Sequence, residues 1–240
     1  MRQVQPQRAI AIVQSNYIPW RGYFDLIAAV DEFVLLDEAQ YTRRDWRNRN
    51  KVKTPQGWCW LTIPVATRGR YHQRISETRV TDPRWGRKHW KTIGACYRGA
   101  TFFERYRPRL EALFLDDSEI FLSRINRRFL EAMCEILRID TPLRNSAEFD
   151  FRADVGRSER LVDICRQAGA TDYLSGPAAR SYLDTELFAA AGIDIHWADY
   201  SGYREYRQLY PPFEPALSVL DLILNEGPGA RGLLKTPEDG

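Results

Sequence analysis

The chain has 240 residues, of which 44% are hydrophobic and 28% are charged, an ordinary composition for a globular protein. This length suits one large domain or two small ones, and the net charge of +3 excludes a protein that binds nucleic acid through its overall charge. The four cysteines are widely spaced and include no Cys-x-x-Cys pair, which argues against a disulfide scaffold and a zinc site.

Location and domain organisation are predicted from features that the sequence lacks. No apolar run approaches the roughly 18 residues that a membrane span needs, and the opening residues, MRQVQPQR, contain no apolar signal-peptide core. We therefore predict a cytoplasmic protein with reduced cysteines and no membrane insertion. No linker rich in proline or serine divides the chain, so we expect one α/β domain over residues 1–240.

The first predicted unit consists of a strand, a helix and a second strand. Residues 9–13 form an almost wholly apolar run, which is typical of a strand buried on both faces. Pro19 and Gly22 indicate a turn, and residues 23–30 carry apolar side chains at helical spacing. Residues 33–36 are a second apolar run and predict a second buried strand. Each strand ends at polar side chains, and in an open α/β sheet ligands bind at the carboxyl ends of the strands.

A basic segment at residues 41–53 follows the second strand. Tyr41 and Trp46 are interleaved in it, and it sets six cations against a single acid, Asp45: Arg43, Arg44, Arg47, Arg49, Lys51 and Lys53. The alternation from residue 47 to residue 53 predicts a strand with one basic face. Arginine forks suit bidentate recognition of phosphate or carboxylate, so we favour a site for an anionic ligand. The alternative is a solvated, charged edge strand that discourages aggregation.

A β-rich insertion at about residues 48–80 and a helical layer at about residues 82–139 are predicted next. Residues 58–65 are rich in aromatic and β-branched side chains and predict a strand that pairs with residues 49–53 in a hairpin. Residues 74–80 alternate in polarity and predict a further strand. Helices are predicted over residues 82–97, 102–115 and 118–139.

A second α/β section begins near residue 141 and completes the fold class. Short strands are predicted at residues 141–145, 172–174 and 193–197, alternating with helices at residues 158–167 and 182–191. This alternation predicts a mostly parallel sheet flanked by helices, with the hairpin region and the helical layer inserted. A last apolar helix is predicted at residues 216–225, and the tail from residue 226 is expected to fray.

Four polar or small runs follow predicted strands: residues 14–17, 37–40, 175–176 and 199–200. They are expected to meet at one cleft, because parallel strands present their carboxyl ends at one sheet edge. Asp37 is the first candidate for a catalytic base and His89 is the second. The candidate substrate-binding residues come from these runs, the basic segment and a tyrosine-rich stretch: Gln14, Asn16, Tyr17, Trp20, Gln40, Arg44, Arg47, Asn48, Arg49, Ser175, Gly176, Asp199, Tyr200, Tyr203 and Tyr206.

Some of these residues also have a structural interpretation. His89 lies beside Trp90 in a predicted helix, where a partly buried structural histidine is the favoured interpretation, and the same holds for His196 in its strand. The tyrosines of residues 200–210 either form a platform for a sugar or base or pack a surface loop, and both interpretations stay open. The three histidines lack metal-ligand spacing, so no metal site is predicted.

The stretch VQSNYIPWRGYFDLIAAVDEFVLLDEAQYTRRDWRNRNKVK closely resembles the opening of WbqC-like proteins. Further pieces agree, so that the resemblance covers about residues 9–227: WLTIPV, His89-Trp90, YLSGPAARSYL, DYSGYREYRQLYPPF and SVLDLILNEG. Many relatives carry His-Gln-Pro where this chain has Gln14-Ser15, and an aspartate is common at the place of Glu38. The resemblance implies a role in the biosynthesis of O-antigen and other bacterial surface polysaccharides, with glycine or aminoacyl transfer as the activity, and it assigns no catalytic residues.

The expected function is an acyl or aminoacyl transferase that acts on an amino sugar or another nucleotide-linked anionic substrate. The donor would be a CoA or carrier thioester or an aminoacyl-tRNA, with no tightly bound cofactor. The alternative is a non-catalytic binding or scaffold protein of a biosynthetic assembly line, which contacts an acidic carrier protein or RNA. An enzyme predicts that Arg47 and Arg49 line a concave site with Asp37, whereas a scaffold predicts that they spread over a convex face.

Overall fold

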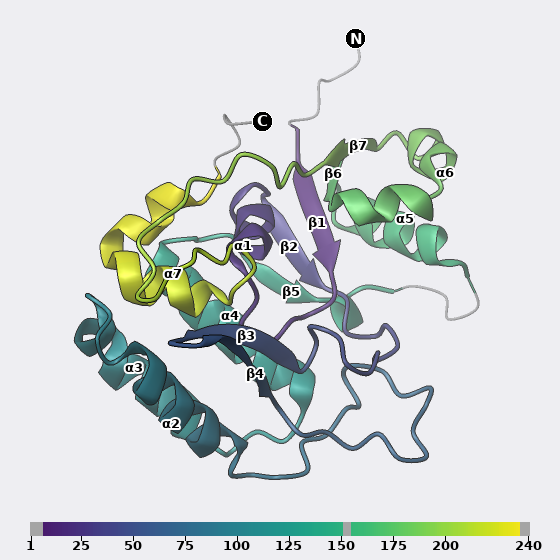
Figure 1. The fold of residues 1–240 in the computed structure, drawn as a ribbon. Helices are drawn as coiled ribbons and strands as arrows, with labels where there is room; N and C mark the ends of the chain where they lie inside the picture. The colour runs from purple at the N-terminus through teal and green to yellow at the C-terminus, as the bar shows by residue number, and fades with distance from the viewer. Residues whose placement is uncertain (1–6, 151–154, 236–240) are drawn as a thin grey trace.

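The computed structural model describes residues 7–150 and 155–235, and at its centre is a five-stranded parallel sheet (Figure 1). The strands lie in the order β5-β2-β1-β6-β7. Their bounds are Ala9–Val13 for β1, Glu32–Leu35 for β2, Leu143–Asn145 for β5, Asp172–Ser175 for β6 and Asp194–Trp197 for β7. The chain adds strands on one side of β1 and then returns to add β6 and β7 on its other side. The predicted fold class, a mostly parallel α/β sheet, is confirmed.

Hydrophobic clusters cover both faces of the sheet. On one face, Ile10, Ile12 and Val34 belong to a cluster with α5 (Arg157–Gln167) and α6 (Thr185–Ala190). On the other face, Ala11 and Phe33 belong to a cluster with α1 (Arg21–Ala28), α4 (Leu122–Leu137) and α7 (Val219–Glu226). Because β1 and β2 are buried on both faces, their sequences are continuous apolar runs rather than alternating ones.

A long excursion separates β2 from β5, although these strands are neighbours in the sheet. It contains the antiparallel hairpin of β3 (Arg49–Thr54) and β4 (Gly57–Thr62), followed by α2 (Trp85–Tyr97), α3 (Phe103–Leu115) and α4. The predicted hairpin is therefore confirmed. The inner face of the hairpin is buried through Val52 and Leu61. Figure 1 shows the hairpin beyond the carboxyl end of β1.

The prediction of a strand at residues 74–80 is wrong. The segment makes only isolated bridges, such as those from Arg74 to Gln40 and from Val80 to Val65. Its backbone turns back on itself, because the Thr78 amide donates to the Ile75 carbonyl and the Thr78 hydroxyl donates to the Arg74 carbonyl. A hydroxyl side chain that hydrogen-bonds the local backbone competes with strand pairing, and polarity alternation alone does not reveal it.

Several predicted boundaries shift where side chains or short turns end an element. α2 begins at Trp85 rather than at residue 82, since the Asp82 carboxylate accepts from the Arg84 amide (3.0 Å) and forms a turn before the helix. Two short 3₁₀ helices, η1 (Ser146–Glu148) and η2 (Pro177–Ser181), follow β5 and β6. The expected fraying of the tail is wrong up to residue 235, because Gly227–Leu233 forms the 3₁₀ helix η3, in which Ala230 is buried. Residues 236–240 lie outside the described residues.

No helix in the described ranges is long and apolar enough to cross a membrane.

Candidate functional site

The loop after β1 has an unusual backbone. Ile18 has a φ of +37°, a value that β-branched residues rarely adopt. The Asn50 side-chain amide fixes this loop by donating to the carbonyls of Tyr17 (3.2 Å) and Ile18 (2.9 Å). Strained backbone of this kind persists only when its surroundings hold it, and it gathers at functional sites. The loop that carries Gln14 and Asn16 is therefore a rigid part of the sheet edge.

Arg47 reaches back from the segment before β3 to this loop. Its guanidinium donates to the Oδ1 atom of Asn16 and the Oε1 atom of Gln14. The nearest carboxylate oxygen, on Asp45, is 3.7 Å away, and the Arg47 side chain is only 13% exposed. Burial lowers the pKa of Arg47, against the nearby charge of Asp45. Two neutral amide oxygens hold the guanidinium in place, and its ion pair with the partly exposed Asp45 is long, so the positive charge is only partly compensated.

Asp37 lies beside Arg47 at the end of β2. Its side chain is buried, with the Oδ1 atom accepting from the Ser15 amide at 3.0 Å. The Oδ2 atom is buried and has no hydrogen-bond partner among the residues that the structure describes. Burial raises the pKa of Asp37 to about 6, while the hydrogen bonds from Ser15 and the charge of Arg47 oppose the rise. A carboxylate with such a pKa can exchange a proton near neutral pH.

The ends of β6 and β7 lie side by side at the same sheet edge. The Ala198 amide donates to the Ser175 carbonyl at 2.8 Å. A Cβ atom at Gly176 would lie 3.4 Å from the Tyr200 hydroxyl, so the glycine lets this ring approach the end of β6. Tyr182, which follows η2, is close enough to Arg47 to affect the pKa of Arg47. The four strand ends that the sequence singled out therefore lie along one edge, and since only residues 199–200 of the four runs line the pocket described below, their meeting in one cleft stays a prediction.

Sequence reasoning missed the residues that support this arrangement. Asn126 of α4 donates to the Ser15 hydroxyl (3.1 Å) and to the Arg47 carbonyl (2.9 Å), and it is fully buried. The Tyr23 hydroxyl donates to the Gln14 carbonyl at 3.0 Å. The available signal was a polar residue, Asn126, inside the apolar stripe of a helix.

The arginines of the basic segment point in different directions. Arg47 points to the sheet edge, whereas the Arg49 guanidinium lies 4.1 Å from the Trp60 ring centroid and donates to the Arg44 carbonyl. Two other predicted binding residues hold loops: the Gln40 side chain donates to the Tyr71 carbonyl, and Asn48 donates to the Ile63 carbonyl, both at 2.8 Å.

The predicted aromatic platform is a packed cluster over α1. Trp20 meets Tyr200 and Tyr203 edge-on, with ring centroids 5.1 and 5.6 Å apart. Tyr203 donates its hydroxyl to Asp25, and the Arg21 guanidinium lies 4.2 Å from its ring centroid. The Tyr206 hydroxyl donates to Asp221 of α7 at 2.7 Å. These contacts favour the packing interpretation of the tyrosines at positions 203 and 206.

His89 lies in the core below the loop that follows β1. Its Nε2 atom donates to the Thr62 carbonyl (3.2 Å), so its Nδ1 atom accepts from the Tyr17 hydroxyl (2.9 Å). Burial lowers the pKa of His89 to about 4, against the hydrogen bond to Thr62. Both ring nitrogens are occupied, and the residue is 6% exposed. This geometry supports a role for His89 in positioning Tyr17.

We expect His89 to make stability depend on pH. Because the pKa is about 4 when folded and about 6.5 when unfolded, this contribution is complete above pH 6.5 and is lost as pH falls toward 4. The loss is about 3 kcal/mol. His89→Gln should remove this pH dependence. Urea unfolding at pH 7.5 and 4.5 should therefore show a smaller loss of unfolding free energy at the lower pH in the variant than in the wild type. Other groups, such as Asp37, change the free energy of unfolding in the opposite direction as pH falls, but they are present in both proteins and cancel in the comparison. An equal loss in both proteins would contradict this assignment.

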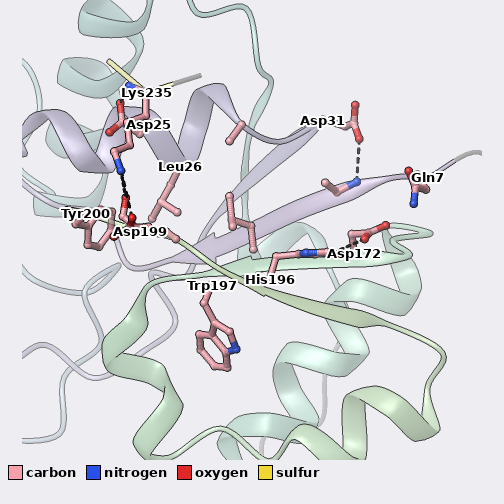
Figure 2. Close-up of a pocket in the computed structure, with 14 residues that line it drawn as sticks. Gln7, Asp25, Leu26, Asp31, Asp172, His196, Trp197, Asp199, Tyr200 and Lys235 are labelled. Carbon is pink, nitrogen blue, oxygen red and sulfur yellow. Dashed lines mark hydrogen bonds and ion pairs between the residues drawn. The ribbon is translucent and has the colours of Figure 1, made fainter. Parts of the chain in front are cut away.

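A pocket of about 550 Å³ lies on the α1 side of β6 and β7 (Figure 2), and neither Arg47 nor Asp37 lines it. Asp199 and Tyr200 line it and connect it to the strand ends. Its other lining residues are Gln7, Ala9, Asp25, Leu26, Ala29, Asp31, Asp172, Leu174, His196, Trp197, Ala198 and Lys235. No group of three or more His, Cys, Asp or Glu side chains in the described part of the chain is arranged to hold a metal ion.

Comparison with known proteins agrees with the resemblance seen in the sequence. The chain matches the WbqC-like protein family over residues 14–232. It is 49% identical over 228 residues to the uncharacterized protein Rv1507c of Mycobacterium tuberculosis, a match that covers 95% of this chain and 98% of the relative. No solved structure matches the chain. The chain belongs to the WbqC-like protein family.

Proposed function

We propose that this protein is a cytoplasmic transferase of bacterial surface polysaccharide biosynthesis, such as the biosynthesis of O-antigen. It would move an acyl or aminoacyl unit, of the glycine type, to the amine of an amino sugar or another nucleotide-linked anionic substrate. The observation that carries the proposal is that Arg47, a largely buried cation, lies close enough to Asp37, a buried carboxylate with an unpartnered oxygen, for the charge of each to affect the pKa of the other. This pair lies at the carboxyl ends of β1 and β2, where open α/β sheets bind ligands.

Each residue has a defined role in the proposed reaction. The Arg47 fork binds a phosphate or carboxylate of the substrate. The substrate amine attacks the carbonyl carbon of the donor, so that a carbon–nitrogen bond forms and the bond from that carbon to the leaving sulfur or oxygen breaks. Asp37 takes the proton from the attacking nitrogen and returns it to the leaving group. The donor is a CoA or carrier thioester or an aminoacyl-tRNA, and the rate gain comes mainly from orientation.

A thermal-shift screen with UDP-N-acetylglucosamine, acetyl-CoA and glycyl thioesters tests the proposal. A ligand at about 100 times its dissociation constant stabilises the folded state by about 2.7 kcal/mol, which raises the melting temperature by roughly 5–10 °C for a chain of this size. We expect such a shift with at least one anionic ligand, and Arg47→Met should lower it to about half or less at the same ligand concentration. The absence of any shift at millimolar concentrations would count against an anion site.

The outer face of the hairpin favours a second candidate function, the binding of an acidic carrier protein or RNA. The rings of Trp46, Trp60 and Trp58 follow one another, with neighbouring centroids 5.4 and 5.8 Å apart. Trp46 is 41% exposed and Trp58 is 44% exposed. Arg49 lies over Trp60 and Lys51 lies over Trp58, each at 4.1 Å. Exposed rings interleaved with cations are typical of surfaces that bind single-stranded nucleic acid.

Substitution of Trp58 separates the two candidates. If the hairpin face binds RNA, Trp58→Ala should weaken the binding of a fluorescent single-stranded RNA by about 5- to 150-fold, the value of one stacked base. Fluorescence anisotropy at two salt concentrations measures this loss and its electrostatic part. Wild-type protein that binds neither the RNA nor an acidic carrier protein would exclude the scaffold function, and nucleotide-sugar binding should be the same in Trp58→Ala as in the wild type.

A further inference from the structure

The pocket beside β7 exists because the chain leaves one face of two strands uncovered. α5 and α6 both pack on the opposite face, where Ile195 and Trp197 also lie. After β7, no helix forms until α7, so the α1 side of β6 and β7 remains open. The apolar part of the lining is formed by Leu174, Ala198, Leu26 of α1 and Ala29, which caps that helix. Figure 2 shows Trp197 directed away from His196, to the other side of the sheet.

A histidine–carboxylate pair lies in this pocket. The Nε2 atom of His196 donates to the Oδ1 atom of Asp172 at 2.6 Å, and the Thr171 hydroxyl donates to its Oδ2 atom, also at 2.6 Å. Burial alone would raise the pKa of Asp172, but these two hydrogen bonds hold it below its usual value. The carboxylate therefore stays ionised and, in the neutral imidazole, favours the tautomer with the proton on Nε2. That tautomer leaves Nδ1 as an acceptor, for which no hydrogen-bond partner is seen in the described residues, and the His196 side chain is 57% exposed.

The side chains around this pair are mostly acidic, whereas the site at Arg47 carries a positive charge. Besides Asp172, the lining residues Asp25, Asp31 and Asp199 carry carboxylates, against the single ammonium of Lys235. A concave site lined by one sign of charge concentrates ligands of the other sign. The pocket therefore favours an ammonium group and disfavours phosphate. Tyr200 lines the pocket at the carboxyl end of β7 and also lies against Gly176, whereas Asp172 is the first residue of β6.

We propose that this pocket binds the primary amine of a polar small molecule such as an amino sugar. The Nδ1 atom of His196 accepts a hydrogen bond from the amine nitrogen, and Asp172 is the positioning residue that fixes the imidazole. The apolar floor contacts the carbon face of the sugar ring. Amine binding stands on the geometry of the pocket and is separate from the attack on the donor proposed above, because neither Asp37 nor Arg47 lines the pocket.

The histidine signals in NMR spectra test the binding directly. The chain contains three histidines, His72, His89 and His196, so each imidazole signal can be assigned from a single His→Gln variant. We expect D-glucosamine at pH 7.5 to shift the His196 signals in a saturable way, whereas D-glucose, which lacks the amine, leaves them unchanged. Equal shifts with both sugars, or no shift with glucosamine, would overturn the proposal.

Matched variants complete the test. His196→Gln and Asp172→Asn should each weaken glucosamine binding by at least about tenfold, and His72→Gln, on an exposed loop, should not change it. His196 and Asp172 both lie on the open face of the sheet, so circular dichroism should show that neither substitution changes the fold. Wild-type affinity in His196→Gln would show that the pair is a surface ion pair only. Arg47→Met should keep glucosamine binding while its nucleotide-sugar binding weakens, so failure of the pocket and failure of the anion site are distinguishable.

Discussion

Asp37→Asn is expected to lower the rate of transfer by roughly 100- to 10,000-fold, the usual effect of losing a general base. The melting temperature should not fall, because asparagine keeps the acceptor for the Ser15 amide and removes a desolvated charge. Because the pKa of Asp37 is raised in the folded protein, ionised Asp37 lowers the free energy of unfolding above pH 6. Steady-state kinetics and thermal unfolding at pH 7.5 measure the two effects. The wild-type rate should also fall as pH drops through about 6, when Asp37 takes up a proton.

Glu38→Gln is the matched control for this prediction. Glu38 is the neighbouring carboxylate, but it forms an ion pair with the exposed Arg74 at 2.6 Å. Its neutralisation should leave the rate within about a factor of two, since an exposed ion pair contributes little. Equal rates for Asp37→Asn and the wild type would remove Asp37 from the reaction, and equal losses in the two variants would indicate a general charge effect.

Arg47→Met is expected to weaken the binding of an anionic substrate by about 10- to 150-fold, which is the value of a hydrogen bond to a charged group. The free energy of unfolding should also fall, by about 1–3 kcal/mol, because methionine leaves the partly buried side-chain oxygens of Asn16 and Gln14 without their donor. Isothermal titration calorimetry with UDP-N-acetylglucosamine measures the affinity, and thermal unfolding measures the stability.

Two further arginine variants sharpen this result. Arg47→Lys keeps the charge but not the planar fork, so its affinity should lie between those of the wild type and Arg47→Met. Arg43→Met removes a charge from the same segment at an exposed position and should change the affinity by less than about threefold. If both positions had equal effects, the attraction would come from the whole basic segment rather than from one bound guanidinium.

Much of the fold could be predicted because local sequence and tertiary environment agree. β1 and β2 are buried on both faces and therefore appear as continuous apolar runs. The hairpin could be recognised from alternation and a turn at Gly57, which has a φ of +124°. Residues 74–80 and the tail could not be predicted, since a side-chain hydrogen bond from Thr78 and the burial of Ala230 decide them.

The site was harder to predict than the fold, because side-chain direction depends on packing. Arg47 and Arg49 are two residues apart, yet one binds the loop after β1 and the other stacks on Trp60. His196 was interpreted as structural because the sequence does not reveal that one face of β7 is left open beside Asp172. Asn126 contacts the site from a helix more than 100 residues away from Ser15 in sequence, and spacing rules cannot predict such contacts.

The most direct test of the central claim, that Arg47 and Asp37 face the same bound anion, is a calorimetric measurement of UDP-N-acetylglucosamine affinity at pH 5 and pH 7.5. The diphosphate diester keeps its charge over this range, so a pH effect must come from the protein. Ionised Asp37 repels the anion, so wild-type protein should bind roughly tenfold tighter at pH 5, which corresponds to a rise of one unit in the pKa of Asp37 on binding. Asp37→Asn should bind with the same affinity at both pH values. A wild-type affinity that does not depend on pH, or an unchanged dependence in Asp37→Asn, would contradict the account.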